Sequence, residues 1–174
     1  MPQDPIDTKC STHFTWRQLI ECGETWRRVG NRVPNLPSQA ESWVSLQALA
    51  QTVLDPVVEH FGAVELTYCF AGPELLREVP GRIAPALDQH AGSELNRRGK
   101  LICTRRGQAA DLYVPGVSSD VAAAWVATHT PFDRLYLYGP DRPLHVSFGP
   151  DNTRQVVEMI AGPSGRRVPR VRRA

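Results

Sequence analysis

The sequence predicts an α+β fold in which N-terminal helices pack on a mostly antiparallel sheet. Apolar side chains recur at three- and four-residue steps across residues 42–62, the pattern of a helix with one buried face. Pro56 lies inside this pattern and is expected to kink the helix. Beyond Gly62 the chain contains short alternating segments bounded by Gly and Pro, which is typical of strands. Helices gathered before a run of strands favour the α+β class.

The composition of the 174-residue chain indicates a globular protein, because its hydrophobic content of 41% is too high for a disordered chain. We expect residues 1–161 to form one domain. The longest apolar run, "DVAAAWVA", is too short to span a bilayer, so no membrane association is expected. The N-terminal residues lack a charged-then-apolar signal pattern, which favours a cytoplasmic protein.

The spacing of the cysteines argues against a structural zinc ribbon. The four cysteines contain no CxxC pair: Cys10, Cys22, Cys69 and Cys103. We therefore expect all four to be free thiols.

The C-terminal residues 162–174 carry an excess of positive charge. The net charge of the chain is only +2, yet this segment holds five arginines and no acid: Arg166, Arg167, Arg170, Arg172 and Arg173. Because Gly, Pro and Ser interrupt it, we expect a disordered tail beyond Ala161. Such a tail could bind nucleic acid or an acidic partner, or simply be a solvated basic end.

Two capping-box patterns mark helix starts in the N-terminal part. Thr15 and Gln18 have this spacing ahead of a short helix that ends at Gly23. Ser38 and Glu41 repeat it ahead of the long amphipathic helix. The Pro- and Asn-rich stretch between them predicts an irregular connector.

The second half of the chain predicts strands separated by turns and two helices. Gly and Pro end most of the strands, and a serine precedes the first of the helices. The polar residues 85–100 are expected to form a loop with a short helix. The predicted strands are 64–70, 109–116, 133–139 and 143–149, and the predicted helices are 118–131 and 151–160.

Side-chain alternation predicts one aliphatic and one polar face for the sheet. Leu112, Leu135 and Val146 fall on the face that packs against the helices. A polar face that holds both a carboxylate and an imidazole is a plausible floor for a binding site. That face carries Asp111, Tyr113, Tyr136, Tyr138, His145 and Ser147.

Asp111 and His145 are two suitable zinc ligands, and a catalytic zinc ion normally takes a third from the protein. Three of the other histidines have local explanations near helix ends: His13, His60 and His129. His90 has none, because "LDQHAGSELN" lacks helix or strand periodicity. By elimination, His90 is the best candidate for the third ligand.

Several motifs resemble those of the zinc D,D-peptidases, the D,D-carboxypeptidase-like and hedgehog-related family, and especially its short phage and bacterial members. The segments "HFTWRQL", "SLQALAQTVLDPV", "GQAADLYV", "PFDRLYLY" and "LHVSF" occur in the family's order across residues 13–160. The resemblance implies a hedgehog/D,D-peptidase-like fold, a Zn²⁺ cofactor and hydrolysis of peptidoglycan-type peptides. The family acts outside the inner membrane, whereas no export signal is visible here.

The resemblance also places the metal ligands. The family's second and third ligands fall on Asp111 and His145. Spacing back from Gly107 for the first ligand reaches Thr104, which is not a zinc ligand. The "DQH" that ends at His90 resembles the family's "SQH" if the loop before "GQAAD" is longer, which costs little closure entropy.

The sequence departs from the family at the position of its substrate-binding arginine. "TYCFAG" places Ala71 there, so the substrate carboxylate loses its bidentate partner. Arg142 or Arg82 could hold an anionic substrate instead. The departure implies an altered substrate specificity.

A second departure concerns the general base. Tyr138 stands at the strand position where the family has a glutamate that deprotonates the zinc-bound water. Asp141, near His145, and Glu94, in the His90 loop, are the candidate replacements.

Two functional hypotheses follow. The first is a zinc-dependent hydrolase, a metallopeptidase or amidase that acts on a small peptide or peptide-like substrate. The second is a non-catalytic binding or structural module of the same fold, with or without metal, whose basic tail binds nucleic acid or an acidic protein. An enzyme needs His90 and a nearby carboxylate, whereas a scaffold is indifferent to both.

Overall fold

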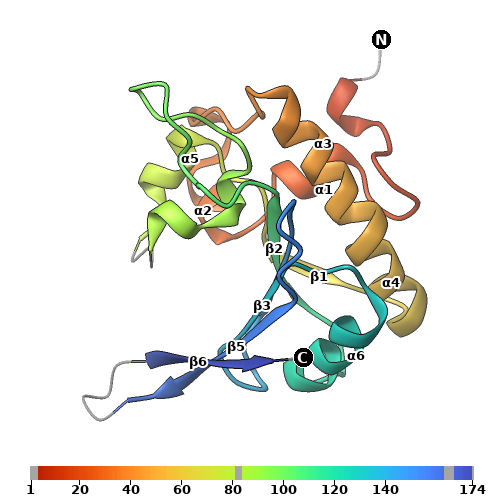
Figure 1. The fold of residues 1–174 in the computed structure, drawn as a ribbon. Helices are drawn as coiled ribbons and strands as arrows, with labels where there is room; N and C mark the ends of the chain where they lie inside the picture. Colours follow the sequence, from red (N-terminus) through yellow and green to blue (C-terminus); the bar gives the residue numbers. More distant parts are fainter. Residues whose placement is uncertain (1–3, 81–83, 163–166, 174) are drawn as a thin grey trace.

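The computed structural model describes residues 4–80, 84–162 and 167–173. It combines helices with one six-stranded sheet of order β1-β2-β4-β3-β5-β6 (Figure 1). Neighbouring strands are antiparallel except β3 and β5, which are parallel, so the predicted α+β class is confirmed with a mixed sheet. The strands are β1 (Glu65–Tyr68), β2 (Gln108–Tyr113), β3 (Arg134–Leu137), β4 (Leu144–Phe148), β5 (Gln155–Ala161) and β6 (Arg167–Arg173).

Helices lie on both sides of this sheet. Figure 1 shows α3, α4 and α6 on one side and the shorter α2 and α5 on the other. The α-helices are α1 (Trp16–Ile20), α2 (Glu24–Val29), α3 (Ala40–Leu49), α4 (Asp55–Phe61), α5 (Pro73–Glu78) and α6 (Ser119–His129). Short 3-10 turns occur at η1 (Pro5–Asp7), η2 (Gly30–Arg32), η4 (Pro85–Leu87) and η5 (Gln89–Ala91), and η3 (Ala50–Leu54) is a π-helical segment.

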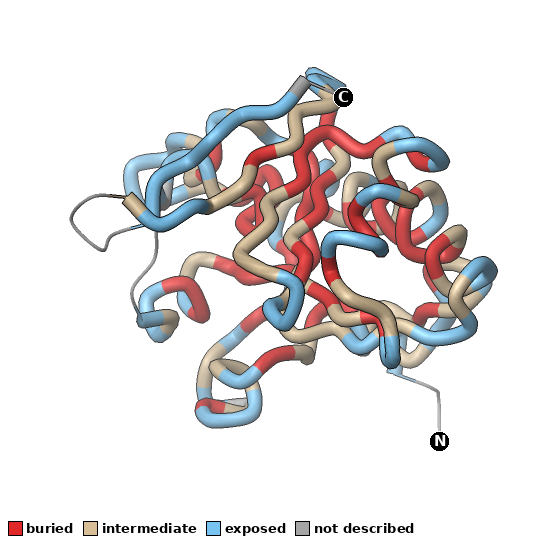
Figure 2. The backbone as a smooth tube through the Cα atoms, turned by 90° about the horizontal axis from the view of Figure 1, so that it is seen from below, coloured by how far each residue is buried: buried red, intermediate tan, exposed pale blue. Residues whose placement is uncertain are grey.

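The main core lies between the sheet and helices α3, α4 and α6. Leu112, Leu135 and Val146 from three strands are fully buried in one cluster with Leu46 and Leu49 of α3. Burying each such side chain contributes about 1.5–3 kcal/mol to folding. Figure 2 shows the buried central strands beside the exposed C-terminal strand. The predicted aliphatic face of the sheet is therefore confirmed.

One of the two predicted capping boxes forms, and the other does not. Thr15 and Gln18 form the predicted capping box at α1. Ser38 does not cap α3, whose N-cap residue is Gln39; the Ser38 hydroxyl donates to the carboxylate of Glu94 instead. The buried Glu94 carboxylate also accepts the backbone N–H of Ser38, the hydrogen bond that Glu41 would make in the predicted capping box.

The long amphipathic helix continues through Pro56 by way of a π-helical segment. Because proline has no N–H and its ring clashes with the preceding turn, an ordinary α-helical turn is unfavourable there. The N–H of Asp55 donates to the carbonyl of Ala50, five residues earlier, which widens the helix just before Pro56. At the predicted kink, the helix thus changes locally from α-helical to π-helical geometry.

Two predictions for the C-terminal part are wrong. Residues 155–161 form β5 instead of a helix, parallel to β3. Residues 167–173, expected in a disordered tail, form β6 on the edge of the sheet. Arg170 and Arg172 of β6 form ion pairs with Glu158 of β5 at 2.6 and 2.7 Å, so part of the excess charge is neutralised within the hairpin.

All four cysteines are free thiols, as predicted. Burial raises the pKa of Cys69 well above its ordinary value, which keeps this thiol protonated and unreactive. Within the described ranges, no helix has both the length and the apolar character needed to cross a membrane.

Candidate metal centre and cavity

Strand register brings three polar side chains side by side on the sheet. Asp111 on β2 lies opposite His145 on β4, and His145 lies opposite Tyr136 on β3. Directly paired residues point to the same face, so all three project away from the main core. The ring centroids of Tyr136 and His145 are 5.2 Å apart and nearly perpendicular. The sequence predicted that these three residues share a polar face, and the strand register places them side by side.

The loop around η5 carries His90 to the same face. The carboxylate of Asp88 accepts the backbone N–H of His90 at 3.1 Å, and the carbonyl of His90 accepts the N–H of Ala71 at 2.9 Å. Gly92 ends the turn with φ +56°, and a side chain there would meet the hydroxyl of Ser42 at 2.9 Å. Backbone contacts therefore fix His90 over the sheet.

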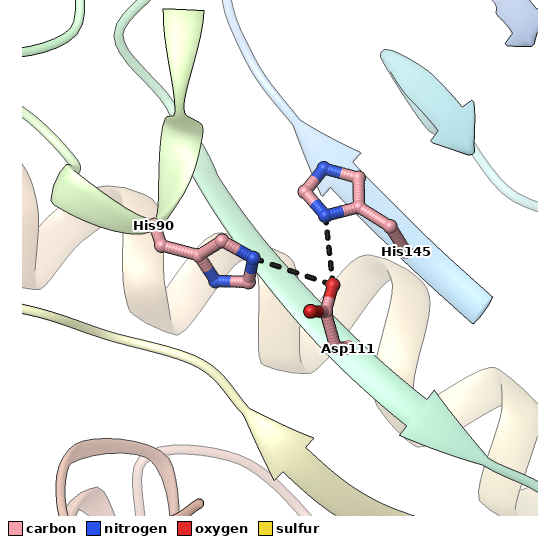
Figure 3. Close-up of side chains that lie close together, drawn as sticks. All are labelled: His90, Asp111 and His145. Atoms are coloured by element: carbon pink, nitrogen blue, oxygen red, sulfur yellow. Dashed lines mark hydrogen bonds and ion pairs between the residues drawn. The ribbon is translucent and has the colours of Figure 1, made fainter. Parts of the chain in front are cut away.

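The side chains of His90, Asp111 and His145 converge (Figure 3). Nδ1 of His145 lies 2.8 Å and Nε2 of His90 lies 3.3 Å from Oδ1 of Asp111. One ligand atom from each residue lies within 4.8 Å of the others, close enough to surround a single metal ion. The three residues predicted as ligands therefore form one cluster.

The other ring nitrogen of His90 has a partner that suits metal binding. Nδ1 lies 2.8 Å from the carbonyl oxygen of Cys69, an acceptor only, so Nδ1 carries the proton. Nε2, which points at Asp111, is then the nitrogen that would lose its proton and bind a metal ion. Such a hydrogen bond from the non-coordinating nitrogen orients histidine ligands in metal sites. The donor set of two imidazoles and one carboxylate fits zinc.

Asp111 and His90 shift each other's pKa values. Burial favours the neutral acid of Asp111, but the facing imidazoles of His90 and His145 outweigh it and hold the pKa of Asp111 well below its usual range. Burial likewise disfavours the charged imidazole of His90, and the attraction of Asp111 still raises the pKa of His90. Asp111 is therefore ionised near neutral pH, as a metal ligand must be.

The cluster lies in the wall of a cavity of about 380 Å³. Its polar lining comes from the sheet and from the loops on either side of η5, and Met159 of β5 contributes to the apolar part. Burial, together with the nearby carboxylate of Asp111, raises the pKa of Tyr138 to about 12, so its hydroxyl remains protonated. The other described residues of the lining are Tyr68, Val79, Pro80, Ala84, Leu87, Asp88, Arg105 and Tyr136.

The structure places only some of the predicted substrate-binding residues at this cavity. Tyr136 and Tyr138 line it. Tyr113 does not, and its hydroxyl donates to the backbone carbonyl of Asp141 at 3.3 Å. Ser147 is buried away from it, where its hydroxyl accepts the N–H of Arg134. Arg82 lies outside the described residues.

Neither predicted general base reaches the cavity. The Glu94 carboxylate is fully buried and accepts the N–H groups of Ser38 and Gln39 at 3.0 and 3.2 Å, in addition to the Ser38 hydroxyl. Asp141 is exposed on the turn before β4. Arg142, also exposed, lines a separate depression that borders Tyr138. The spacing of these residues in sequence did not reveal where their side chains point.

Three polar residues of the cavity were not predicted: Tyr68, Asp88 and Arg105. Two of them had a sequence signal, because Asp88 belongs to the "DQH" segment and Arg105 belongs to "TRRG", just before "QAAD". The ring of Tyr68 lies against His90 with centroids 4.1 Å apart. Each contacts a residue that was predicted from the sequence: Tyr68 and Asp88 contact His90, and Arg105 contacts Tyr136.

Comparison with protein-family models, curated proteins and solved structures finds no significant match for this chain. The side chains around the cavity are therefore the basis for a functional proposal. Their main feature is an open cluster of three candidate ligands on a recessed wall of the molecule.

Proposed function

We propose that the chain is a zinc-dependent hydrolase of the D,D-peptidase type, with an altered specificity for a small peptide or peptide-like substrate. The hedgehog/D,D-peptidase-like fold is part of this proposal, and it rests on the order of the sequence motifs. One observation carries the proposal: His90, Asp111 and His145 converge within 4.8 Å in the wall of a cavity large enough for a small substrate.

The arrangement supports a catalytic rather than a purely structural metal site. Structural zinc sites use four protein ligands, whereas catalytic sites use three and leave one position open. Among the described residues only three candidate ligands converge here, and the cavity lies beside them. A bound zinc ion would supply an acidified water and polarise a substrate carbonyl.

The roles of the chain's own residues follow from their positions. His90, Asp111 and His145 would hold the ion, and the Cys69 carbonyl would keep Nε2 of His90 directed at it. Tyr138 would donate a hydrogen bond to bound substrate, because its hydroxyl stays protonated across the physiological pH range. Apolar lining residues such as Met159 would exclude water.

The first test measures zinc content. Purified protein incubated with zinc and dialysed should hold about one ion per chain, as a three-residue site requires. His90→Ala, Asp111→Asn and His145→Ala should each lose it. His129→Ala is the matched control, because His129 is exposed at the end of α6 and should leave the zinc content unchanged. Wild-type protein that takes up no zinc would refute the metal centre.

The second test measures hydrolysis. Zinc-loaded protein should cleave at least one member of a panel of short acylated peptides and amides, and zinc-free protein should cleave none. Hydrolysis that persists unchanged in His145→Ala would contradict the proposed role of the cluster.

A non-catalytic module is the second candidate, favoured by one observation. Glu94 and Asp141, the predicted bases, both lie away from the cavity. Such a module would bind an acidic partner or nucleic acid through the exposed arginines of β6. Stoichiometric zinc binding without hydrolysis of any panel member would favour it.

A further inference from the structure

We propose that Arg105, together with the hydroxyl of Tyr136, binds a carboxylate of the substrate at the cavity wall beside the metal cluster. This inference rests on the proposed function and adds the charge class of the substrate and the residue that selects it. Of the arginines that the sequence suggested for an anionic group, Arg142 lines a separate depression and Arg82 lies outside the described residues, whereas Arg105 lines the cavity.

The position of Arg105 follows from two hydrogen bonds. Its Nη1 donates to the hydroxyl of Tyr136 at 3.0 Å and to the carbonyl of Leu87 at 3.3 Å. Tyr136 is paired with His145 across β3 and β4, so the guanidinium lies at the end of the row that leads from Asp111 through His145. A ligand anchored on the metal and extended along this row reaches Arg105 next.

The guanidinium retains donors for a ligand. Arginine carries five N–H donors, and the hydrogen bonds found among the described residues use Nη1 only. Both partners are neutral oxygens, and no described carboxylate lies within ion-pair distance of Arg105. A half-buried guanidinium with neutral partners is suited to a bidentate carboxylate.

The other charges of the cavity favour an anion once a metal ion is bound. The acids on the described lining are Asp88 and Asp111. Asp111 would be a metal ligand, and Asp88 caps the η5 turn that holds His90. A divalent ion and Arg105 together exceed the negative charge of these two carboxylates, so the cavity would attract an acidic ligand.

The test uses thiols that anchor on the metal and differ only in charge. Cobalt(II) replaces zinc, because ligation by a thiolate gives an absorption band that can be titrated. The probes are mercaptoacetate, 3-mercaptopropionate and 4-mercaptobutyrate, each compared with its uncharged amide. For at least one chain length we expect the carboxylate to bind wild-type protein about tenfold or more tightly than the amide, as a charge-assisted hydrogen bond provides.

Two variants and a matched control assign the preference. In Arg105→Gln the carboxylate and the amide should bind equally, and in Tyr136→Phe the preference should be reduced. Arg106→Gln is the control, because the neighbouring Arg106 is exposed and does not line the cavity; it should keep the full preference. The cobalt spectrum without thiol reports whether each variant keeps its metal site.

Three outcomes would overturn the inference. Equal binding of carboxylates and amides to wild-type protein at every length would show that no anion site exists. A preference that survives in Arg105→Gln would assign it to another group, including chelation of the cobalt ion by the carboxylate itself. Protein that binds no cobalt would refute the proposed function itself, and the inference would fail with it.

Discussion

At the residue scale, the carboxylate of Asp111 determines how the cluster responds to pH. It lies 2.8 Å from His145 and 3.3 Å from His90. The pKa of Asp111 is lower in the folded protein than its ordinary value of 3.8, so its stabilising contribution is present above that pH and is lost as the pH falls. The pKa of His90 is raised above 6.5, so its contribution is complete below that value and is lost as the pH rises.

The ion pair between Asp111 and His90 should therefore stabilise the metal-free protein most between about pH 4 and 6.5. Compared with Asp111→Asn, wild-type protein should have a free energy of unfolding higher by about 1–3 kcal/mol near pH 5.5, and the difference should shrink toward pH 9. Urea denaturation at a series of pH values, with a chelator present, measures it. A difference that grows steadily up to pH 9 would contradict the assignment.

Bound zinc should reverse this trend. Zinc must displace the proton that Asp111 favours on the imidazole of His90, so the stabilisation that saturating zinc provides should increase as the pH rises from 5 to 8. The same denaturation series with and without zinc reports it. Asp111→Asn should show little zinc stabilisation at any pH.

The sequence predicted the residues of this cluster better than their surroundings. Asp111 and His145 followed from strand alternation, and His90 from the absence of any helix or strand pattern around it. Arg105 and Glu94 both lie in irregular segments, where sequence spacing does not determine the direction of a side chain. Only the tertiary structure shows that Arg105 lines the cavity while Glu94 is buried at the start of α3.

At the element scale, Glu94 stabilises the start of α3 from outside the helix. Its carboxylate accepts the backbone N–H groups of Ser38 and Gln39, next to the first turn. Charged acceptors near a helix N-terminus also interact favourably with the helix dipole. Glu94 therefore joins the η5 loop to α3, and its role is structural.

Glu94→Ala should lower the free energy of unfolding by about 2–4 kcal/mol, because it removes a buried carboxylate that accepts three hydrogen bonds and leaves a void in its place. Zinc affinity should change by less than about threefold, since Glu94 does not line the cavity. Glu41→Ala is the control: Glu41 is exposed in the first turn of α3, and its loss should cost about 0.5 kcal/mol or less. A Glu94→Ala protein of normal stability that has lost only hydrolysis would instead identify Glu94 as the base.

The strands were less predictable than the helices for a physical reason. Residues 155–161 are flanked by polar residues and contain Glu158 and Met159, which suit a helix, yet Val156, Val157 and Ile160 favour a strand. The outcome depends on the open edge of β3, which these residues occupy in parallel register. Likewise, β6 forms because β5 offers a partner strand. Neither partner is visible from local sequence.

At the scale of the whole molecule, the buried carboxylate of Asp133 joins three parts of the chain. It accepts from the Gln89 amide beside the cluster at 3.1 Å and from the backbone N–H of Thr153 before β5 at 2.7 Å. It also forms an ion pair with Arg134, which begins β3. The fully buried side chain of Asp133 thus links the turn that carries His90 to the starts of β3 and β5.

Asp133→Ala should therefore disturb both folding and metal binding. Removing one partner of a buried ion pair leaves the Arg134 charge uncompensated, and we expect the free energy of unfolding to fall by about 3–5 kcal/mol. Zinc affinity should fall about tenfold, because Gln89 loses the contact that holds the turn carrying His90. Urea denaturation and zinc titration measure the two effects separately.

Asp151→Ala is the matched control for this experiment. Asp151 is exposed between β4 and β5, near the same strands, and its loss should change stability by no more than about 0.5 kcal/mol. If Asp133→Ala lost stability but kept its zinc affinity, the backbone contacts of His90 with Ala71 would suffice to position the ligand. If both properties were retained, the network would not connect the site to the fold. The expected loss of both would show that the metal centre depends on contacts that span the whole sheet.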